Sequence, residues 1–211
     1  MTIYNICELC KVEVPQAGET MILSILNEKI KDFAHSSEIY KKTGDITIVA
    51  NTVEYTLATE FTDIDGEKVV RIDFLDLDSE QVEPIYQLKY DIFEGKIRFY
   101  SYIGNPITEI PSAIYYIRIQ YVAVPANKTI NSTLTEIDSQ FHEGLRAGVM
   151  ATLYKLYATI DKVFQDGGSA KVKDMASMQY NEVLYDKTIH KAMRYANSGT
   201  SIPKAIITPS Y

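Results

Sequence analysis

Residues 113–124 read AIYYIRIQYVAV, and Pro125 follows them. β-branched and aromatic residues fill this run, and such residues favour strands because their side chains pack well on a pleated surface. Pro125 ends the strand, since proline has no N–H to donate to a neighbouring strand. This run is the strongest strand signal in the chain, and it separates a strand-rich middle third from a helical C-terminal third.

Six shorter runs upstream either alternate apolar and polar residues or are rich in β-branched and aromatic residues. Both patterns are typical of strands. Asn51-Thr52 is expected to turn one hairpin, and Gly95 to turn another. Pro84 restricts its own run to a sheet edge. The middle third is therefore expected to form an antiparallel sheet of about five or six strands. The runs are residues 45–50, 53–57, 68–77, 81–88, 90–93 and 96–102.

The N-terminal part divides at Pro15. Residues 1–15 are expected to form an extended lead. From Gly18 onward, apolar residues recur every three or four positions, which is the period of an amphipathic helix. Lys41-Lys42 would close this helix, since cations favour a helix C-terminus. The pattern predicts one helix over about 18–42.

Two further helices are expected after a polar linker. An apolar stripe predicts a helix over about 139–165, with Asp138 or Ser139 able to cap its start. A second stripe predicts a helix over about 170–195. The break at residues 166–169 is only four residues long, so the two helices should pack as an antiparallel pair.

Residues 196–211 have no helical period and contain two prolines and an apolar stretch. Such a segment is typical of an arm that docks on a partner, either by adding a strand or by filling a groove. The alternative is a tail that folds back on the chain's own sheet. The residues expected to make the docking contacts are Ile202, Pro203, Ala205, Ile206, Ile207, Pro209 and Tyr211.

These patterns together predict an α+β fold, in which a long N-terminal helix and a C-terminal helical hairpin carry an inserted antiparallel sheet. A single domain is expected over residues 1–195, followed by the arm at 196–211. Its helical core would comprise residues 18–42 and 139–195, with the β insert at about 45–125. A chain of 211 residues is long enough for one domain of this size.

The charge is uneven along the chain. The net charge is −7, which disfavours a protein that grips phosphate backbones, since basic surface supplies most of that affinity. Residues 54–95 hold 12 acidic side chains against three basic ones, whereas residues 161–211 hold seven basic and five acidic. Tyrosine is abundant, with 16 copies and no Trp, which suits either strands or a surface that meets a partner.

No motif for chemistry is complete. Cys7 and Cys10 are spaced as metal or redox ligands, but no second such pair accompanies them, so packing is the expected role. His142 and Glu143 lack a second His at metalloprotease spacing, and a surface or capping role is expected. Residues 63–67 resemble only part of a calcium loop and are expected to form a solvated turn. We therefore expect no catalytic residue, metal or cofactor, and no enzyme.

Three stretches carry a family resemblance: Asp45–Leu57 (DITIVANTVEYTL), Ile117–Pro125 (IRIQYVAVP) and Leu134–Tyr157 (LTEIDSQFHEGLRAGVMATLYKLY). A helix, a β-rich insert, a strand ending in Val-Pro, a polar linker and a helical hairpin follow one another. This order resembles that of the head–tail connector (adaptor) proteins of tailed bacteriophages. The resemblance covers most of residues 18–165.

The resemblance implies a virion structural protein in the neck, made in the host cytoplasm. No stretch of the sequence approaches the roughly 18 apolar residues that a membrane-spanning helix needs, so no membrane association is expected. It implies a ring, commonly of twelve subunits, that docks beneath the portal protein, contacts neighbouring connector or tail proteins, seals the head and seats the tail. The arm would reach the portal, and an acidic channel would let double-stranded DNA pass without binding it. The residues expected to pack subunits together are Phe141, Leu145, Ala147, Gly148 and Ala151.

Three other functions fit the same patterns. One is a tail-completion or tail-terminator ring protein, which shares the layout. Another is a cellular α+β binding module that uses a Tyr-rich sheet face. The third is an enzyme whose site is assembled from scattered residues such as Asp138, His142 and Glu143.

Overall fold

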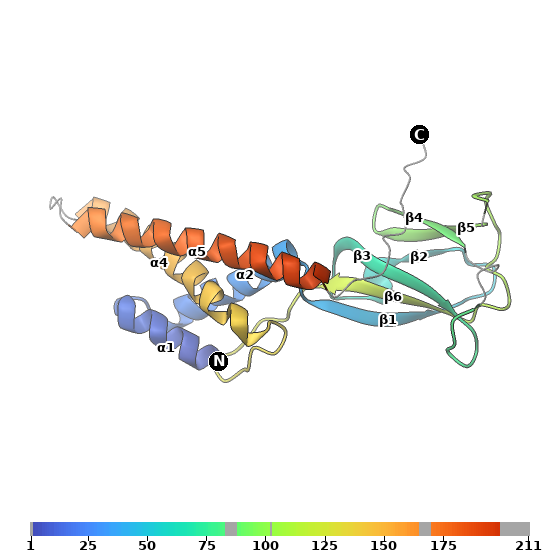
Figure 1. Cartoon of the computed structure of the whole chain (residues 1–211), viewed down its shortest axis with the longest axis horizontal. Coiled ribbons are helices and arrows are strands. Elements are labelled where there is room, and N and C mark those ends of the chain that lie inside the picture. The colour runs from blue at the N-terminus through green and yellow to red at the C-terminus, as the bar shows by residue number, and fades with distance from the viewer. Residues whose placement is uncertain (1, 83–87, 102, 165–169, 199–211) are drawn as a thin grey trace. The chain divides into compact units, whose positions relative to one another are not determined.

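A computed structural model describes residues 2–82, 88–101, 103–164 and 170–198, and it leaves the side chains of residues 158–174 undescribed. The chain divides into two compact units. Met1–Ile39 and Pro125–Tyr211 form the helical unit, and Tyr40–Val124 form the β unit. Helices and antiparallel sheets are both present, so the expected α+β class is confirmed (Figure 1).

The helical unit opens with α1 (Ile3–Glu13), where an extended lead was expected. The hydroxyl of Thr2 caps this helix by accepting a hydrogen bond from the Asn5 N–H at 3.2 Å. Ile3, Ile6 and Cys10 are fully buried. The extended interpretation was wrong because these residues recur at helical spacing, with the cysteines acting as small apolar side chains.

Helix α2 (Glu19–Ser37) is shorter than the sequence indicated. It ends at Glu38, whose φ of 54° lies in the left-handed region typical of helix C-caps. The Ser37 hydroxyl donates to the Phe33 carbonyl at 2.6 Å in the last turn. Lys41 and Lys42, expected to close the helix, instead begin the first strand.

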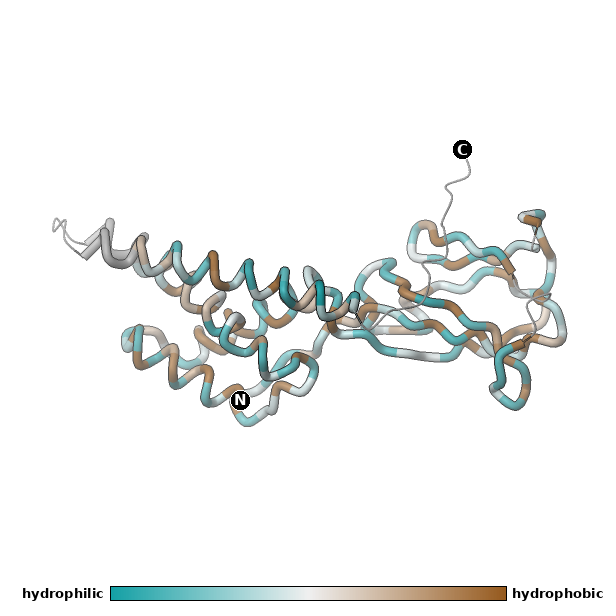
Figure 2. The backbone as a smooth tube through the Cα atoms, in the orientation of Figure 1, coloured by the Kyte–Doolittle hydropathy of each residue, from teal (hydrophilic) through white to brown (hydrophobic). Residues whose placement is uncertain are grey.

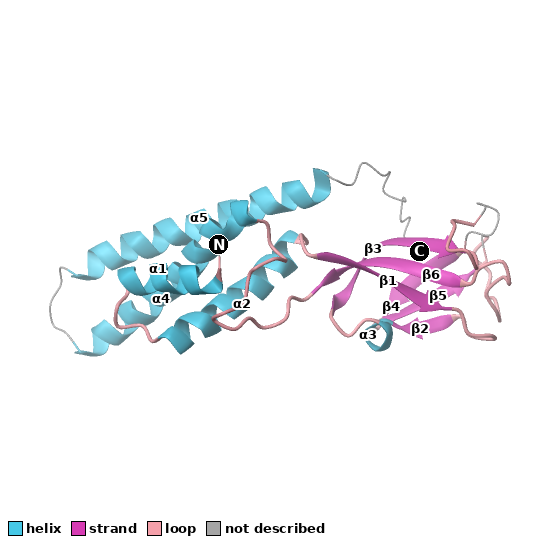
Figure 3. Ribbon diagram, turned by 90° about the horizontal axis from the view of Figure 1, so that it is seen from below, coloured by secondary structure: helices cyan, strands magenta, loops and turns pink. Residues whose placement is uncertain are grey.

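The C-terminal helices form the expected antiparallel pair (Figure 3). Asp138 caps the short helix η2 (Ser139–Phe141) by accepting a hydrogen bond from the Gln140 N–H at 3.0 Å. Helix α4 (His142–Phe164) follows without a break, and α5 (Ala170–Ser198) runs back along it. Phe33 of α2 packs against Phe141 and against Tyr185 of α5, with ring centroids 5.9 and 6.2 Å apart.

The β unit holds two three-stranded antiparallel sheets, where a single sheet was expected. One has the order β1-β6-β3, and the other has the order β2-β5-β4. The four-residue helix α3 (Leu57–Glu60) follows β2. The strands are β1 (Lys41–Thr47), β2 (Glu54–Thr56), β3 (Ile64–Leu75), β4 (Lys89–Phe93), β5 (Lys96–Tyr100) and β6 (Tyr116–Ala123).

Pairing confirms one expected hairpin and overturns the other. Strands β4 and β5 pair across Gly95, whose φ of 75° suits a tight turn. The expected hairpin over residues 45–57 does not form, because β1 pairs with β6 while β2 pairs with β5 in the other sheet. Of the run expected at 81–88, Gln81 bridges to Leu75 and residues 83–87 lie outside the described part of the chain.

The two sheets share one apolar core. Alternate residues of β6, such as Ile117 and Ile119, are fully buried, and Figure 2 shows apolar and polar residues following one another along the strands. Phe99 of β5 meets Phe74 of β3 edge-on, with ring centroids 5.9 Å apart. The run at residues 113–124 therefore supplies the central strand of the first sheet, as its composition suggests.

Candidate interaction surfaces

The five residues expected to pack subunits together are all buried inside the helical unit. Phe141 contacts Phe33 and Tyr195, and Leu145 is fully buried in the same apolar core. Ala147, Gly148 and Ala151 are buried as well. Since the chain's own helices already cover these side chains, their role between subunits stays a prediction.

The small residues of α4 bring α5 close. A Cβ atom added to Gly148 would lie 2.7 Å from Cδ2 of Tyr185, and one added to Gly144 would overlap the side chain of Thr188. Real Cβ atoms do not approach other atoms so closely, so only glycine fits at these positions. The close helix packing that these residues indicate therefore occurs within one chain.

The outer face of α5 is partly apolar. Ala176, Tyr180 and Val183 are exposed, with Tyr180 at 68% and Val183 at 51%. Their spacing of four and three residues places them on one side of the helix. Asn181 and Tyr185 lie buried on the other side. This stripe is one exposed apolar surface of the helical unit, and single-residue propensities did not reveal it.

The tyrosines divide between the core and the surface. Tyr55, Tyr121 and Tyr185 are buried, whereas Tyr115 and Tyr180 are largely exposed. The Tyr185 hydroxyl donates to the Lys29 carbonyl and to Oδ2 of Asp32, at 3.2 and 3.0 Å. Burial, the carboxylate of Asp32 and this hydrogen bond all raise the pKa of Tyr185. The abundant Tyr residues therefore lie both in the core and on the surface, and contact of the exposed ones with a partner stays a prediction.

The seven arm residues expected to dock on a partner, from Ile202 to Tyr211, lie outside the described residues. Their docking role stays a prediction. The described chain ends in α5 at Ser198, three residues beyond the expected end of this helix.

The two cysteines pack in the core, as expected. Both are buried and free, and burial raises the pKa of Cys7 to about 11 and that of Cys10 to about 12. Thiols with such values stay protonated near neutral pH, whereas metal ligation and redox exchange use the thiolate. Within the described chain, no three His, Cys, Asp or Glu residues cluster so that they could hold a metal ion.

His142 is buried rather than at the surface, where it was expected, and its exposed fraction is 3%. Its Nε2 lies 2.9 Å from the Ile137 carbonyl, while its Nδ1 has no hydrogen-bond partner in the described structure. Burial lowers the pKa of His142, so the imidazole is neutral near pH 7. The adjacent Glu143 accepts hydrogen bonds from Arg146 instead, and the two do not form a catalytic pair.

Several acidic side chains of the β unit are paired in the structure. Asp63 pairs with Lys42 and accepts a hydrogen bond from the Tyr121 hydroxyl at 2.9 Å. Glu54 lies 2.9 Å from the Lys96 ammonium. The solvated turn expected at residues 63–67 is only partly correct, because β3 already begins at Ile64.

The comparison with known families assigns the chain to one of them. The family described as SU10 adaptor protein matches residues 7–201, which include both the helical unit and the β insert. The chain belongs to the SU10 adaptor protein family. No curated protein matches it.

Membership in this phage head–tail adaptor family agrees with the resemblance found in the sequence. The chain is therefore a structural protein of the junction between head and tail of a tailed phage. A structural family of this kind suggests a non-enzymatic role. Among the described helices of the adaptor, none has the length and apolar character needed to span a membrane.

Proposed function

We propose that this adaptor forms a ring, commonly of twelve subunits, that docks beneath the portal protein. It seals the filled head, seats the tail and leaves a channel for DNA. The observation that carries the proposal is the family match across residues 7–201, since it includes both units rather than one. The cellular binding module is not favoured, because the family acts at the head–tail junction.

The outer face of α5 is the surface proposed for contacts between subunits. Tyr180 and Val183 are exposed there, and a neighbouring copy would remove their apolar surface from water. A contact between unlike faces of two copies repeats around an axis and closes into a ring.

The charge of the adaptor suits a channel that DNA passes without binding. The β unit holds 14 acidic and eight basic side chains, a net charge of −6. Carboxylates that face a channel repel phosphates, so DNA would move past such a surface instead of adhering to it. The proposed partners are therefore the portal, the neighbouring neck and tail proteins, and further copies of the adaptor.

The test is assembly with the portal protein of the same phage. Purified adaptor is mixed with portal rings and examined by electron microscopy and analytical ultracentrifugation. We expect a ring of adaptor on the portal, and no ring on the portal with Tyr180→Asp and Val183→Asp combined. Gln179→Asp, an exposed change on the same helix, should leave assembly intact.

Two outcomes would contradict the proposal. If the adaptor binds isolated tail tubes and not portal rings, it is a tail-completion or tail-terminator protein. If it binds neither, the connector function is wrong. A monomeric adaptor in the absence of portal contradicts nothing, because assembly can depend on the portal surface.

A further inference from the structure

Three loops of the β unit gather at one end of its sheets. They are residues 48–53, 76–82 and 103–115, which belong to the connections from β1 to β2, from β3 to β4 and from β5 to β6. The register aligns Thr47, Leu75 and Tyr116 at this end of the first sheet. Backbone hydrogen bonds join the loops, since the Tyr115 N–H donates to Leu75 and the Ile48 N–H to Tyr115. We call this surface the loop end.

The opposite end of the β unit carries the connections to the rest of the chain. The unit begins at Tyr40 and ends at Val124, and Lys41 pairs with Val122 there. The helix α3 and the turn at Gly95 also lie at that end, where the Leu57 N–H donates to the Gly95 carbonyl. The loop end is therefore the end of this unit that no chain connection occupies.

The loop end holds more acidic than basic side chains, although Lys89 lies beside its third loop, where a Cβ atom added to Gly104 would be 3.8 Å from the Lys89 Nζ. The described residues of its three loops include four acidic ones, Asp76, Asp78, Glu80 and Glu109, and no Lys or Arg. Oδ1 of Asp76 accepts hydrogen bonds from the N–H groups of Asp78 and Glu80, at 3.0 and 2.9 Å, which holds the second loop in a defined turn. Elsewhere in this unit, acidic residues such as Asp45 pair with basic ones. The loops thus concentrate negative charge.

Large apolar side chains are exposed on the same loops. Leu77 is 62% exposed and Ile103 is 73% exposed, and Val49 and Tyr115 are also exposed. These apolar side chains leave much of their surface in contact with water. Their presence on all three loops indicates a surface that is covered by a partner.

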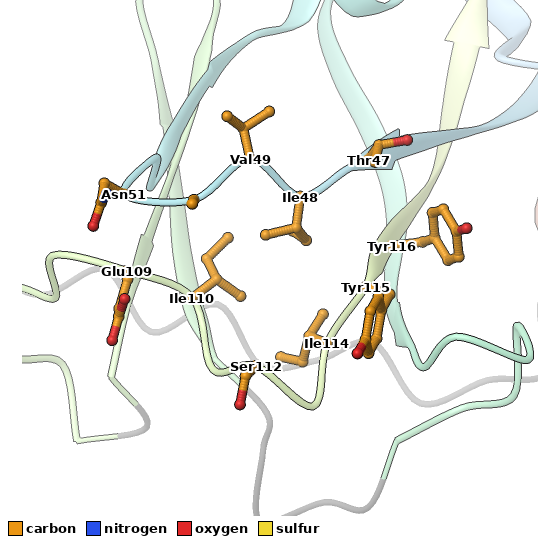
Figure 4. A pocket seen from close by; sticks show the side chains of 11 residues that line it. Thr47, Ile48, Val49, Asn51, Glu109, Ile110, Ser112, Ile114, Tyr115 and Tyr116 are labelled. Carbon is orange, nitrogen blue, oxygen red and sulfur yellow. The ribbon is translucent and has the colours of Figure 1, made fainter.

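A groove lies between two of these loops (Figure 4). It has a volume of about 330 Å³. The side chains of Ile48, Ile110 and Ile114 point into it, and the exposed Glu109 lines its edge. Such a groove suits a partner segment in which an apolar residue stands next to a cationic one. The apolar side chain would contact the floor, and the cationic side chain would pair with the carboxylate.

We infer that the loop end is a docking surface for a segment of another head–tail junction protein that combines apolar side chains with Lys or Arg and lacks acidic residues. This inference rests on the proposed function and adds the chemistry of one partner. The four acidic residues repel phosphates, so the loop end does not take nucleic acid. The isoleucines of the groove bury the apolar side chains, and the loop carboxylates select the basic ones.

The test uses the full-length protein and synthetic peptides. The probe is an eight-residue peptide in which Ile, Thr, Ile and Val stand between Lys residues. One control replaces Lys with Glu, and another replaces Ile and Val with Ser. Binding is followed by NMR of the isoleucine methyl groups, because Ile48, Ile110 and Ile114 lie in the groove while Ile25 and Ile30 lie in the helical unit.

We expect the basic apolar peptide to shift the groove methyls and to leave those of the helical unit in place. The Glu peptide should bind at least about tenfold more weakly, since like charges meet, and the Ser peptide should not bind measurably. Combining Asp78→Asn with Glu109→Gln should raise the Kd by about fivefold. The matched control, Glu60→Gln with Glu94→Gln, neutralises two exposed carboxylates at the opposite end and should leave the Kd unchanged.

Three results would overturn the inference: no methyl shift, equal binding of the Lys and Glu peptides, or equal loss of affinity in both double variants. Shifts of the groove methyls with protein concentration alone would identify a second copy as the occupant and would also overturn it. Failure of the proposed function would give a different result from failure of this inference. A protein that assembles on portal rings but ignores the peptide is a connector without this docking surface, whereas one that binds the peptide but no portal is not a connector.

Discussion

Gly144 and Gly148 determine how closely α4 and α5 approach. Replacing glycine by alanine inside a helix normally stabilises it by about 1 kcal/mol. At Gly148 we expect the opposite, a loss of about 1 kcal/mol in the free energy of unfolding, because the new methyl group would displace the Tyr185 ring. This ring cannot move freely, since its hydroxyl is bonded to Lys29 and Asp32. Urea unfolding of Gly148→Ala measures the change.

The control for this prediction is Gln179→Ala, an exposed substitution on α5. It should change the free energy of unfolding by less than about 0.5 kcal/mol. If Gly148→Ala stabilises the protein instead, α5 does not pack against α4 as the structure shows.

His142 should make the stability of the helical unit depend on pH. Its pKa in the folded protein is lowered from the ordinary value of 6.5 because the imidazole is buried. The unfolded chain therefore binds more protons below about pH 6.5, and the free energy of unfolding falls as the pH drops until it passes the folded-state pKa. We expect a measurable loss between about pH 7 and pH 5.5, before most carboxylates titrate.

Two variants separate His142 from the other histidines. His142→Gln keeps an N–H that can donate to the Ile137 carbonyl but does not titrate, so its stability should be nearly constant over this pH window. His190→Gln removes an exposed histidine and should keep the pH dependence of the wild type. If the free energy of unfolding depends on pH in the same way in the wild type and in His142→Gln, His142 is not the titrating group.

At the scale of elements, α1 belongs to the core of the helical unit. Ile6 is fully buried and packs with residues of the other helices. We expect Ile6→Ala to lower the free energy of unfolding by about 2–5 kcal/mol, through the lost apolar burial and the cavity left behind. Val12→Ala, on the exposed side of α1, should cost less than about 0.5 kcal/mol. Similar values for the two variants would show that α1 is only loosely attached.

The sequence contained the signal for α1, but Cys7 and Cys10 drew attention to possible chemistry. Read as apolar residues, they join Ile3 and Ile6 in a pattern with steps of three and four, which predicts a helix. The antiparallel pair of α4 and α5 was predictable because its apolar stripes are long and its connection is short. Local periodicity therefore determines the helices of this protein.

The arrangement of strands was not predictable from local sequence. The run around Asn51-Thr52 looks like a hairpin, and strands adjacent in sequence usually pair. Here β1 pairs with β6, about 70 residues away, and β2 pairs in the second sheet. Such pairings depend on which apolar faces meet in the folded unit, and a single sequence does not encode them locally. Only the tight turn at Gly95 was fixed by its own residues.

The interaction surfaces were the least predictable feature. Small residues such as Gly148 correctly indicate close packing, but they do not say whether the neighbouring helix belongs to the same chain. The structure supplies that partner, since Tyr185 covers Gly148. The loop end was missed for a related reason. Its loops are separated in sequence by whole strands, and only the fold brings their acidic and apolar side chains together.

At the scale of the whole molecule, the family match extends over an inserted unit and the helices on both sides of it. The insert begins after α2 and ends before the polar linker, so the helical unit is built from two distant parts of the chain. Asn27 of α2 joins these parts, because its side chain exchanges hydrogen bonds with the backbone of Lys128 at 2.6 and 3.0 Å. An adaptor can thus keep one helical unit while its insert meets another protein.

The C-terminal arm gives the last prediction. A chain that stops after Ser198 lacks all seven residues expected to dock on the portal, yet it keeps every described helix and strand. We expect its thermal midpoint to be unchanged and its binding to portal rings to be lost, as measured by sedimentation with the portal. In the full chain, Ile206→Asp should weaken binding at least about tenfold, because an unpaired charge would enter an apolar contact. Ser201→Asp adds the same charge at a polar position and should have little effect. If the truncated chain binds portal rings as tightly as the full chain does, the arm has no part in docking, and the contact must be made by the helical unit or the β unit.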